Sequence, residues 1–283
     1  MCGYFLDFVG ETLIEWRIKV DISVIIFIIV GFGSIISGFL LEKGQLSALF
    51  LLAPAVIVFG GTFGAVGLTF PGEILKRLPG IIKVAINPKK IDLPGLIAYF
   101  KDVSYKTRKN GLLSLEGEIS SDPNLDPFIK KGLQLVVDGV DPQAVRSILE
   151  LELEYTSERH REGASIFEQA GGYSPTLGII GTVMGLIHIL ADLSDPATLG
   201  PKIASGFIAT LYGLSFANLF SLPIATRLKV IDGKEYNEKS LIIEAILYVQ
   251  EGINPNTIAE KLKGFLSKAE VAKFEGMDGK AEV

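Results

Sequence analysis

The chain has 283 residues, of which 48% are apolar, and its mean hydropathy is +0.41. A water-soluble domain of mixed composition is more polar on average, so the composition indicates a membrane protein. The net charge of −5 and the lack of interleaved basic and aromatic residues argue against a nucleic-acid partner. The single cysteine, Cys2, excludes an internal disulfide framework and a cysteine-based metal site.

Residues 1–19 do not have the pattern of a signal peptide. Their basic residues follow the apolar ones, and no cleavage site of small residues follows the first apolar stretch. We interpret this segment as an N-terminal extension. The alternative is that it is a start-site artefact and that translation begins at Val20.

Four stretches contain no Asp, Glu, Lys or Arg, and each is long enough for a membrane-spanning helix, which needs about 20 residues. They are Ile22–Leu41, Leu46–Phe70, Ala170–Ala191 and Ile203–Thr226. Glycines recur in them, and in lipid such residues let helix backbones pack closely. Since the four stretches supply no carboxylate, any ion that the protein moves needs an ionisable carrier from a partner.

Only the third and fourth stretches add polar groups at similar depth. These groups are Thr182 and His188 on the third stretch, and Thr210 and Asn218 on the fourth. A threonine hydroxyl in a membrane helix often bonds back to a carbonyl of its own helix. Both interpretations of the threonines, own-helix bonding and a polar site, stay open at this point.

Basic residues near the ends of the four stretches predict the orientation, because cytoplasmic loops are enriched in Lys and Arg. One side holds Arg17, Lys19, Lys76, Arg77, Lys83, Arg227, Lys229 and Lys234, and the other only Lys43 and Lys202. We therefore expect the N-terminus, the large insert and the tail in the cytoplasm.

The insert and the tail have helical patterns. Apolar residues recur at helical spacing from Leu93 to Ile119, and Asn110-Gly111 allows a break. Capping signals predict a helix from Pro127 to Val137, and a long helix from Asp141-Pro142 towards Gly171-Gly172. After the fourth stretch we expect helices at Tyr236–Gln250 and from Asn254-Pro255 to about Leu266, and then 15 frayed residues.

These patterns predict an all-α integral membrane protein with four transmembrane helices, a large helical cytoplasmic insert between helices 2 and 3, and a cytoplasmic helical tail. The expected divisions are the extension 1–19, helices 1 and 2 in 20–70, the insert 71–169, helices 3 and 4 in 170–226, and the tail 227–283. No catalytic motif stands out: His160 and His188 lack nearby ligands at metal-binding spacing, and no phosphate-binding loop is present. We expect neither enzymatic activity nor a metal or cofactor.

Two features stand out from the background. The first is a charged segment, Arg108, Lys109, Glu116 and Glu118, interrupted by the apolar pair Leu112-Leu113. On a continuous helix Arg108 and Glu116 would lie about 80° apart around the axis and ~12 Å apart along it, as separate outward charges. The alternative is an ordinary solvated helix face.

The second feature is a pair of prolines, Pro175 at the start of the third stretch and Pro223 near the end of the fourth. A proline inside a membrane helix removes one backbone hydrogen bond and kinks the helix. The alternative is that each proline marks a plain helix boundary.

Several of these motifs resemble the flagellar motor stator subunit MotA, called PomA in sodium-driven motors. The matching motifs are Ser174-Pro175-Thr-Leu-Gly-Ile-Ile-Gly-Thr182-Val-Met-Gly185, Asp195-Pro196-Ala-Thr-Leu-Gly-Pro201, Ile208-Ala-Thr210-Leu-Tyr-Gly213, Arg108-Lys-Asn-Gly-Leu-Leu-Ser-Leu-Glu116 and Ile242-Ile-Glu-Ala-Ile-Leu-Tyr-Val-Gln-Glu-Gly252. The resemblance extends from about Asp21 to Leu266 and covers both membrane and cytoplasmic parts in the same order.

The resemblance implies a homopentamer in the bacterial cytoplasmic membrane, around the single helices of a MotB-like dimer whose aspartate carries the ion. Arg108 and Glu116 match the family's opposite charges that engage the rotor protein FliG, and Lys109 matches an accessory basic position. Pro175 and Pro223 match prolines that couple ion flow to rotation. In the same way, Thr182 and Thr210 match threonines near the ion path. Glu118, by contrast, does not align with the additional acidic residues of the sodium-type relatives, so no role is carried over to it.

Two rival functions remain. ExbB and TolQ, which energise the outer membrane, share the threonine–glycine segment but have three spans and lack the charged segment around Arg108. A stand-alone ion channel usually has an ionisable residue inside the membrane, and the four stretches have none of the acidic or strongly basic type. The transported ion is H+ or Na+, since hydroxyls suit both; we favour protons.

Overall fold

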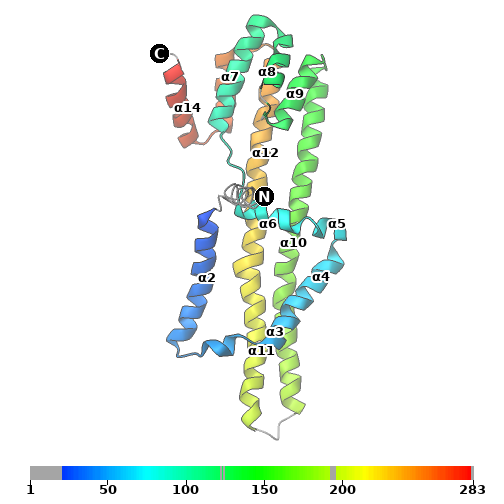
Figure 1. Cartoon of the computed structure of the whole chain (residues 1–283), viewed down its shortest axis with the longest axis vertical. Helices are drawn as coiled ribbons and strands as arrows, with labels where there is room; N and C mark the ends of the chain where they lie inside the picture. Colours follow the sequence, from blue (N-terminus) through cyan, green and yellow to red (C-terminus); the bar gives the residue numbers. More distant parts are fainter. Residues whose placement is uncertain (1–20, 122, 124, 192–195, 282–283) are drawn as a thin grey trace, which may run out of the picture. The chain divides into compact units, whose positions relative to one another are not determined.

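The computed structural model describes residues 21–121, 123, 125–191 and 196–281, so the proposed extension 1–19 lies outside the described residues. All regular elements of this described part are helical (Figure 1). Contacts divide the chain into two compact units. Unit 1 extends up to Lys89 and includes Glu162–Lys229; unit 2 consists of Lys90–Arg161 and the chain from Val230 onward. The expected division at the membrane boundaries stays a prediction.

Unit 1 begins with α2, Ile22–Leu41, which matches the first apolar stretch. The carboxylate of Asp21 caps this helix by accepting a hydrogen bond of 3.2 Å from the backbone N–H of Ser23. The second apolar stretch is helical but not uniform. It contains the 3₁₀ turn η1 (Leu46–Leu49), α3 (Leu52–Ala55), the π-helical turn η2 (Val56–Gly60) and α4 (Gly61–Thr69), and α5 (Gly72–Leu75) and α6 (Leu78–Ile86) follow it.

Two long helical runs supply residues to both units. The first, α10, is one helix from Pro142 to Ala191, so it continues through Gly171-Gly172 and Pro175. The second consists of α11 (Pro196–Phe216), the π-helical turn η4 (Ala217–Ser221) and α12 (Leu222–Gln250). The expected separate helix Tyr236–Gln250 is therefore wrong as an isolated element, because α12 joins it directly to the fourth apolar stretch.

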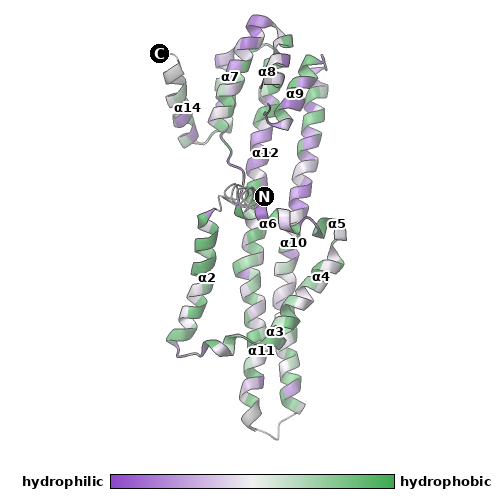
Figure 2. Cartoon of the chain, viewed as in Figure 1, coloured by the Kyte–Doolittle hydropathy of each residue, from purple (hydrophilic) through white to green (hydrophobic). Residues whose placement is uncertain are grey.

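Within the described residues, four helical segments are long and apolar enough to cross a membrane, and each includes most of one predicted stretch. Figure 2 shows hydrophobic colouring along most of α2, and a mixture of hydrophobic and hydrophilic residues on α7, α8 and α9. The predicted fold class, an all-α membrane protein with four spans and a helical insert, is confirmed.

Unit 2 is built from short helices and the polar parts of α10 and α12. Its further elements are α7 (Leu93–Asn110), η3 (Leu112–Ser114), α8 (Leu115–Ser121), α9 (Pro127–Val137), α13 (Pro255–Leu262), η5 (Lys263–Phe265) and α14 (Lys268–Ala281). Asp126, Asp141 and Asn254 cap α9, α10 and α13, each accepting a hydrogen bond of 2.9 Å from the backbone N–H two residues on. The predicted starts of these three helices are confirmed.

A hydrophobic core of leucine, isoleucine, valine and phenylalanine side chains fills unit 2. Its largest fully buried members are Phe100, Leu133, Leu149, Ile246 and Phe274. Phe274 belongs to α14, which packs against α7, and Lys273 of α14 contacts Asp92 at 2.8 Å. The expectation that the last 15 residues are frayed is therefore wrong for residues 269–281, and 282–283 lie outside the described residues.

Gly111 breaks the helix that carries the charged segment. Its φ of +82° is a conformation that glycine adopts readily, and it ends α7 at Asn110 before η3 and α8 begin. The signal for a break is thus confirmed. The continuous-helix geometry for Arg108 and Glu116 is wrong, because these residues lie on different helices, α7 and α8.

Candidate functional site

The closest packing in unit 1 is between α10 and α11, at positions where both helices have small residues. A Cβ added to Gly178 would lie 2.9 Å from the carbonyl oxygen of Ala209, and one added to Gly181 would lie 2.5 Å from the Cβ of Ala209. Gly185 likewise faces the backbone of Gly206. Glycine at these positions allows the two backbones to approach, as the sequence predicted for Gly181 and Gly185.

The same interface brings Thr182 and Thr210 together. Their hydroxyl oxygens are 2.6 Å apart, and Thr182 Oγ1 lies 2.8 Å from the carbonyl oxygen of Gly206 and 3.1 Å from that of Gly178. Thr210 Oγ1 is 3.3 Å from the carbonyl oxygen of Gly178. Own-helix bonding and contact between the two threonines are therefore both present.

This threonine pair can either bind a cation or order water. Each hydroxyl has one hydrogen to donate and two lone pairs to accept with, so one threonine donates to the other, which can donate to a backbone carbonyl, and both oxygens keep acceptor capacity. Oxygen ligands of this kind suit a hard cation, and they equally suit a water molecule that passes protons. The pair has no charge of its own, so the site is chemically incomplete for carrying an ion.

The other two polar residues that the sequence singled out, Asn218 and His188, do not join this site. Asn218 is exposed, and its Nδ2 donates to the carbonyl oxygen of Leu214 on the same helix at 2.9 Å. His188 is exposed near the end of α10. Among the described residues, no hydrogen bond connects either side chain to the threonine pair.

Pro175 lies inside α10, at a second close contact with α11. The hydroxyl of Ser174 donates to the carbonyl oxygen of Gly213 at 3.1 Å, and a Cβ on Gly213 would lie 2.4 Å from the carbonyl oxygen of Ser174. Pro175 is seven positions, about two turns, from Thr182. The helix continues past this proline, so the plain helix-boundary interpretation of Pro175 is wrong.

Pro223 is the second residue of α12, which directly follows the π-helical turn η4. Helical structure continues from α11 through η4 into α12, so this proline does not end the helical run either. Ser221, the last residue of η4, is buried, and its Oγ has no hydrogen-bond partner among the described residues. π-Helical turns often occur at functional sites. Since α10 and α11 are antiparallel, both prolines lie on the same side of the threonine pair (Figure 1).

Sequence reasoning missed a polar junction near the start of α2. Arg227 Nη2 donates to Asp21 Oδ2 at 2.5 Å, and Arg227 Nε donates to the carbonyl oxygen of Ala85 at 2.6 Å. The hydrogen bond from the Ser23 hydroxyl and the bond from Arg227 hold the pKa of the Asp21 carboxyl at about 2. The junction joins the start of α2, the end of α6 and the first turns of α12, four residues after Pro223.

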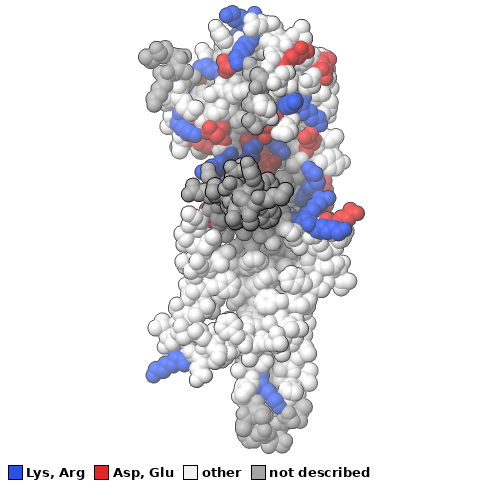
Figure 3. Space-filling model, viewed as in Figure 1, with Lys and Arg blue, Asp and Glu red and all other residues white. Residues whose placement is uncertain are grey.

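In unit 2, Arg108 and Lys109 lie in the last turn of α7, and Glu116 is the second residue of α8. All three side chains are exposed, and none of them forms an ion pair with another described residue. On the face drawn in Figure 3, charged side chains gather over unit 2 and are sparse over the apolar helices of unit 1. Arg108, Lys109 and Glu116 are thus available to a partner.

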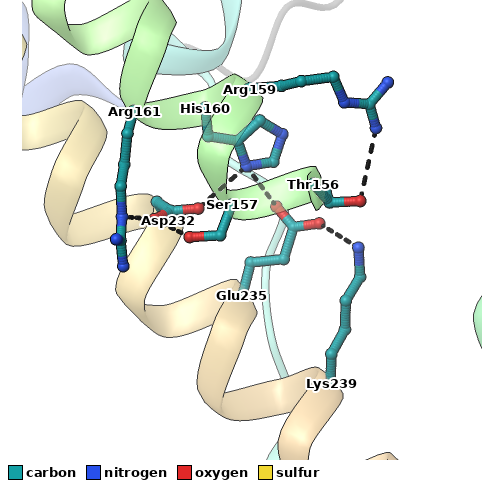
Figure 4. Close-up of polar contacts among 8 residues, drawn as sticks. All are labelled: Thr156, Ser157, Arg159, His160, Arg161, Asp232, Glu235 and Lys239. Carbon is teal, nitrogen blue, oxygen red and sulfur yellow. Dashed lines mark hydrogen bonds and ion pairs between the residues drawn. The ribbon is translucent and has the colours of Figure 1, made fainter. Parts of the chain in front are cut away.

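A second polar cluster joins α10 to α12 within unit 2, and no sequence pattern predicts it (Figure 4). Buried Asp232 accepts hydrogen bonds from the Ser157 hydroxyl at 2.8 Å and from His160 Nδ1 at 3.1 Å, and Arg161 Nε is 3.6 Å away. Glu235 Oε2 lies 3.7 Å from His160 Nδ1, and Glu235 Oε1 lies 2.8 Å from Lys239 Nζ. The serine bonds to the aspartate and not to the histidine, so this Asp232 cluster has the geometry of a structural clasp and not of a catalytic triad.

The comparisons with known proteins agree with this architecture. Residues 120–240 match the model of the "MotA/TolQ/ExbB proton channel family". The chain is 37% identical to the uncharacterized protein YtxD of Bacillus subtilis, over 88% of this chain and 89% of that protein. It is 35% identical to motility protein A of B. subtilis, over 90% of this chain and 94% of that protein.

A solved structure, the flagellar MotAB stator complex of B. subtilis, has a chain that superposes with a TM-score of 0.83 at 36% identity, covering 88% of this chain and 98% of that one. The match to the C. jejuni MotAB structure has a TM-score of 0.82 at 29% identity, covering 88% of this chain and 96% of that one. The structural similarity thus extends over the membrane spans and over the insert. The chain belongs to the motility protein A (MotA/PomA) family.

Proposed function

We propose that the chain is the A-type subunit of a flagellar stator in the bacterial cytoplasmic membrane. With a MotB-like single-span partner it forms a complex that conducts ions and converts ion-motive force into torque on the rotor, without enzymatic activity of its own. Family membership and the match to MotAB structures support this function over an ExbB/TolQ-type energiser. The experiment that tests it is complementation: expression of the chain and its partner should restore swimming to cells that lack their own stators.

One observation carries the ion-conducting part of this proposal. The four spans have no Asp, Glu, Lys or Arg, yet Thr182 and Thr210 place two hydroxyls 2.6 Å apart between α10 and α11. Moving an ion through a bilayer usually requires an ionisable group within it. A carboxylate on the partner's helix would supply that charge, and the threonine pair would orient the ion or its water.

The transported ion is a proton in this proposal. The two hydroxyls can order a water chain, although they could also coordinate sodium. Swimming speed measured across a sodium titration, with and without a protonophore, separates the two ions. Speed that is independent of sodium and lost with the protonophore supports protons, whereas speed that rises with sodium and survives the protonophore contradicts them.

The torque-generating contact is assigned to Arg108, Lys109 and Glu116, which would engage a FliG-type rotor protein. Their exposure and their lack of partners among the described residues support this role. Opposite charges on the rotor would steer the contact and set its register. They are not expected to supply much binding energy, because solvent and salt screen exposed ion pairs.

Coupling between ion flow and torque is assigned to Pro175 and Pro223. Both interrupt the hydrogen-bond ladder of helices that continue past them, on one side of the threonine pair. The double variant Pro175→Ala, Pro223→Ala should assemble normally and lose torque, while Thr182→Val should chiefly lower ion flux. If the double variant produced as much torque as the wild type, the coupling role would be contradicted and both prolines would have a structural role only.

We further propose that five copies assemble around two copies of the partner, with both termini in the cytoplasm. Gly60 and Gly64 of the second span support this assembly, because a Cβ built on either residue would meet no other part of the described chain within 4 Å, apart from its own helical turn and chain neighbours. Native mass spectrometry of the purified complex tests the stoichiometry. A stable monomer that binds no MotB-like protein would contradict it.

A further inference from the structure

An apolar pair lies between the charges that we assign to the rotor contact. Leu112 and Leu113 form most of the turn η3, which separates Lys109 at the end of α7 from Glu116 at the start of α8. The side chain of Leu113 is 71% exposed, and that of Leu112 is 37% exposed. Tyr105, one turn before Lys109 on α7, is 62% exposed. An apolar surface of three side chains, Tyr105, Leu112 and Leu113, therefore adjoins the charged residues.

The backbone around Leu113 is held in place from both sides. Gly111, at φ +82°, turns the chain, and its carbonyl oxygen accepts hydrogen bonds from the Ser114 N–H at 3.1 Å and from the Ser114 hydroxyl at 2.7 Å. Leu115, two positions after Leu113, is fully buried in the core of unit 2. The fold thus uses Leu115 as its anchor and leaves Leu113 outside the core, where a polar residue would serve folding equally well.

The charges alone give a weak contact. An exposed ion pair typically changes an affinity by less than about fivefold, whereas burying a leucine side chain changes it by roughly 10- to 100-fold. Protein interfaces commonly have an apolar centre that excludes water, surrounded by a polar rim. Arg108 and Lys109 on one side and Glu116 on the other have the positions of such a rim.

We propose that Leu113 is the apolar anchor of the contact with the rotor protein, with Leu112 and Tyr105 beside it. The surface that receives it has an apolar pocket, an acidic group opposite Arg108 and Lys109, and a basic group opposite Glu116. This inference rests on the proposed stator function, and it adds the source of the binding energy to a contact otherwise described by charge. The charged side chains then steer and orient the rotor protein, and burial of Leu113 supplies the binding energy.

The mixture of charges favours a protein over other occupants. An anionic lipid surface attracts clusters of Lys and Arg without nearby acids, whereas here Glu116 adjoins the leucine pair. A second copy of the chain would have to place this same turn against itself or against another of its surfaces. Vesicle binding and self-association are therefore included as outcomes of the test.

The test compares two exposed leucines of unit 2. Leu113→Ala and Leu113→Ser are made in the full chain with its partner, and Leu151→Ser is the matched control, since Leu151 is 55% exposed on α10. Binding of the purified complex to the purified rotor protein is measured over a salt series. We expect Leu113→Ala to weaken binding about tenfold with an unchanged salt dependence. Arg108→Gln should reduce the salt dependence, and Leu151→Ser should match the wild type.

Membrane abundance and thermal unfolding of each variant check that it folds, and Leu113→Met should restore most of the binding. Wild-type affinity in Leu113→Ser, or equal losses in Leu113→Ser and Leu151→Ser, would overturn the inference. If Arg108→Gln weakens binding and Leu113→Ser does not, the proposed role of Leu113 is contradicted, whereas the proposed rotor contact of the charged residues is supported. If the wild-type complex binds no rotor protein, or if Leu113→Ser instead abolishes binding to anionic vesicles or to a second copy, the proposed rotor contact fails too.

Discussion

The two units of the chain are stabilised by different physical means. In unit 1, α10 and α11 touch through glycine backbones and hydroxyl–carbonyl hydrogen bonds. Its buried apolar clusters, around Phe167 and around Val66, are small, and large apolar side chains such as Phe27, Leu52 and Leu68 are exposed. In unit 2 the apolar side chains form one large buried core, and Asp232 and Glu238 are the charged residues that are buried among its described residues. Lipid removes the hydrophobic drive between helices, so unit 1 depends on close fit, whereas unit 2 depends on burial.

This difference determines where each unit can carry function. Close backbone packing in unit 1 allows a polar site between α10 and α11 where small residues and hydroxyls meet, as at Thr182 and Thr210. The core of unit 2 does not need its exposed side chains, so surface residues such as Arg108, Leu113 and Glu116 can contact a partner. We therefore expect added side-chain volume to be the most damaging change in unit 1, and lost side-chain volume to be the most damaging change in unit 2.

The largest effect is expected from Gly213→Ala in unit 1. The added Cβ would lie 2.4 Å from the backbone oxygen of Ser174 and 3.2 Å from the Cα of Pro175, and no rotamer change relieves a clash with backbone. Folded protein in the membrane should fall about tenfold or more. Gly172→Ala is the control, because the space around Gly172 on α10 is open and alanine favours helices. Equal abundance of both variants would show that the close packing is dispensable.

The next effect is expected from Phe100→Ala in unit 2. Phe100 is fully buried, and truncating such a residue typically destabilises by about 3–5 kcal/mol. Hydrogen exchange of the intact protein in detergent should accelerate throughout unit 2 and stay unchanged in unit 1. Leu151→Ala, at an exposed site, should change the stability by less than about 0.5 kcal/mol. Faster exchange in both units would mean that they unfold together, which would contradict the claim that the two units are stabilised separately.

A smaller effect is expected from Asp232→Asn. The amide keeps an acceptor for the Ser157 hydroxyl but loses the charge that faces His160 and Arg161. Loss of such a bond to a charged group destabilises by about 1–3 kcal/mol. Hydrogen exchange should rise chiefly around Ser157 on α10 and Asp232 on α12. Glu152→Gln, which removes an exposed pair with Lys131, is the matched control, and an equal effect of both would refute the clasp.

The smallest effect is expected from Arg108→Glu. An exposed charge contributes about 0–1 kcal/mol to a contact and is screened by salt, so swimming should weaken without being abolished. Membrane abundance should not change, and a compensating charge reversal on the rotor should restore part of the speed. Unfolding of the insert by this variant would support the alternative that Arg108 belongs to an ordinary solvated helix face.

The parts of the fold that local chemistry determines could be predicted from the sequence. Asp126-Pro127, Asp141-Pro142 and Asn254-Pro255 each combine an N-cap with a proline at the first helical position, and each begins a helix where predicted. The four spans follow from their lack of charge and their length.

Features that depend on tertiary contacts could not be predicted. Residues 268–281 have few apolar positions, and α14 forms because Phe274 packs into the core of unit 2. Gly171 lies inside α10 because a Cβ there would meet Leu222, so close packing outweighs its low helix propensity. In the Asp232 cluster the partners lie on two helices, 72 and 75 residues apart in the chain, and no local pattern gives that pairing.

For the candidate site, the sequence predicted Thr182 and Thr210 at similar depth from the antiparallel directions of their helices. It could not predict that their oxygens are 2.6 Å apart, because that distance depends on how closely Gly178 and Ala209 approach. The exposure of Arg108 and Glu116 was predicted for the wrong reason. The helix is broken at Gly111, and the residues point outward from two separate helices.

Ion flux into proteoliposomes tests the central claim most directly. Vesicles are prepared with the chain alone, with the chain and its single-span partner, and with the partner and Thr182→Val. The account predicts flux only when the partner is present, since the four spans supply no carboxylate, and reduced flux in the Thr182→Val vesicles. Robust, selective flux from the chain alone would contradict the account and would identify the protein as a channel in its own right.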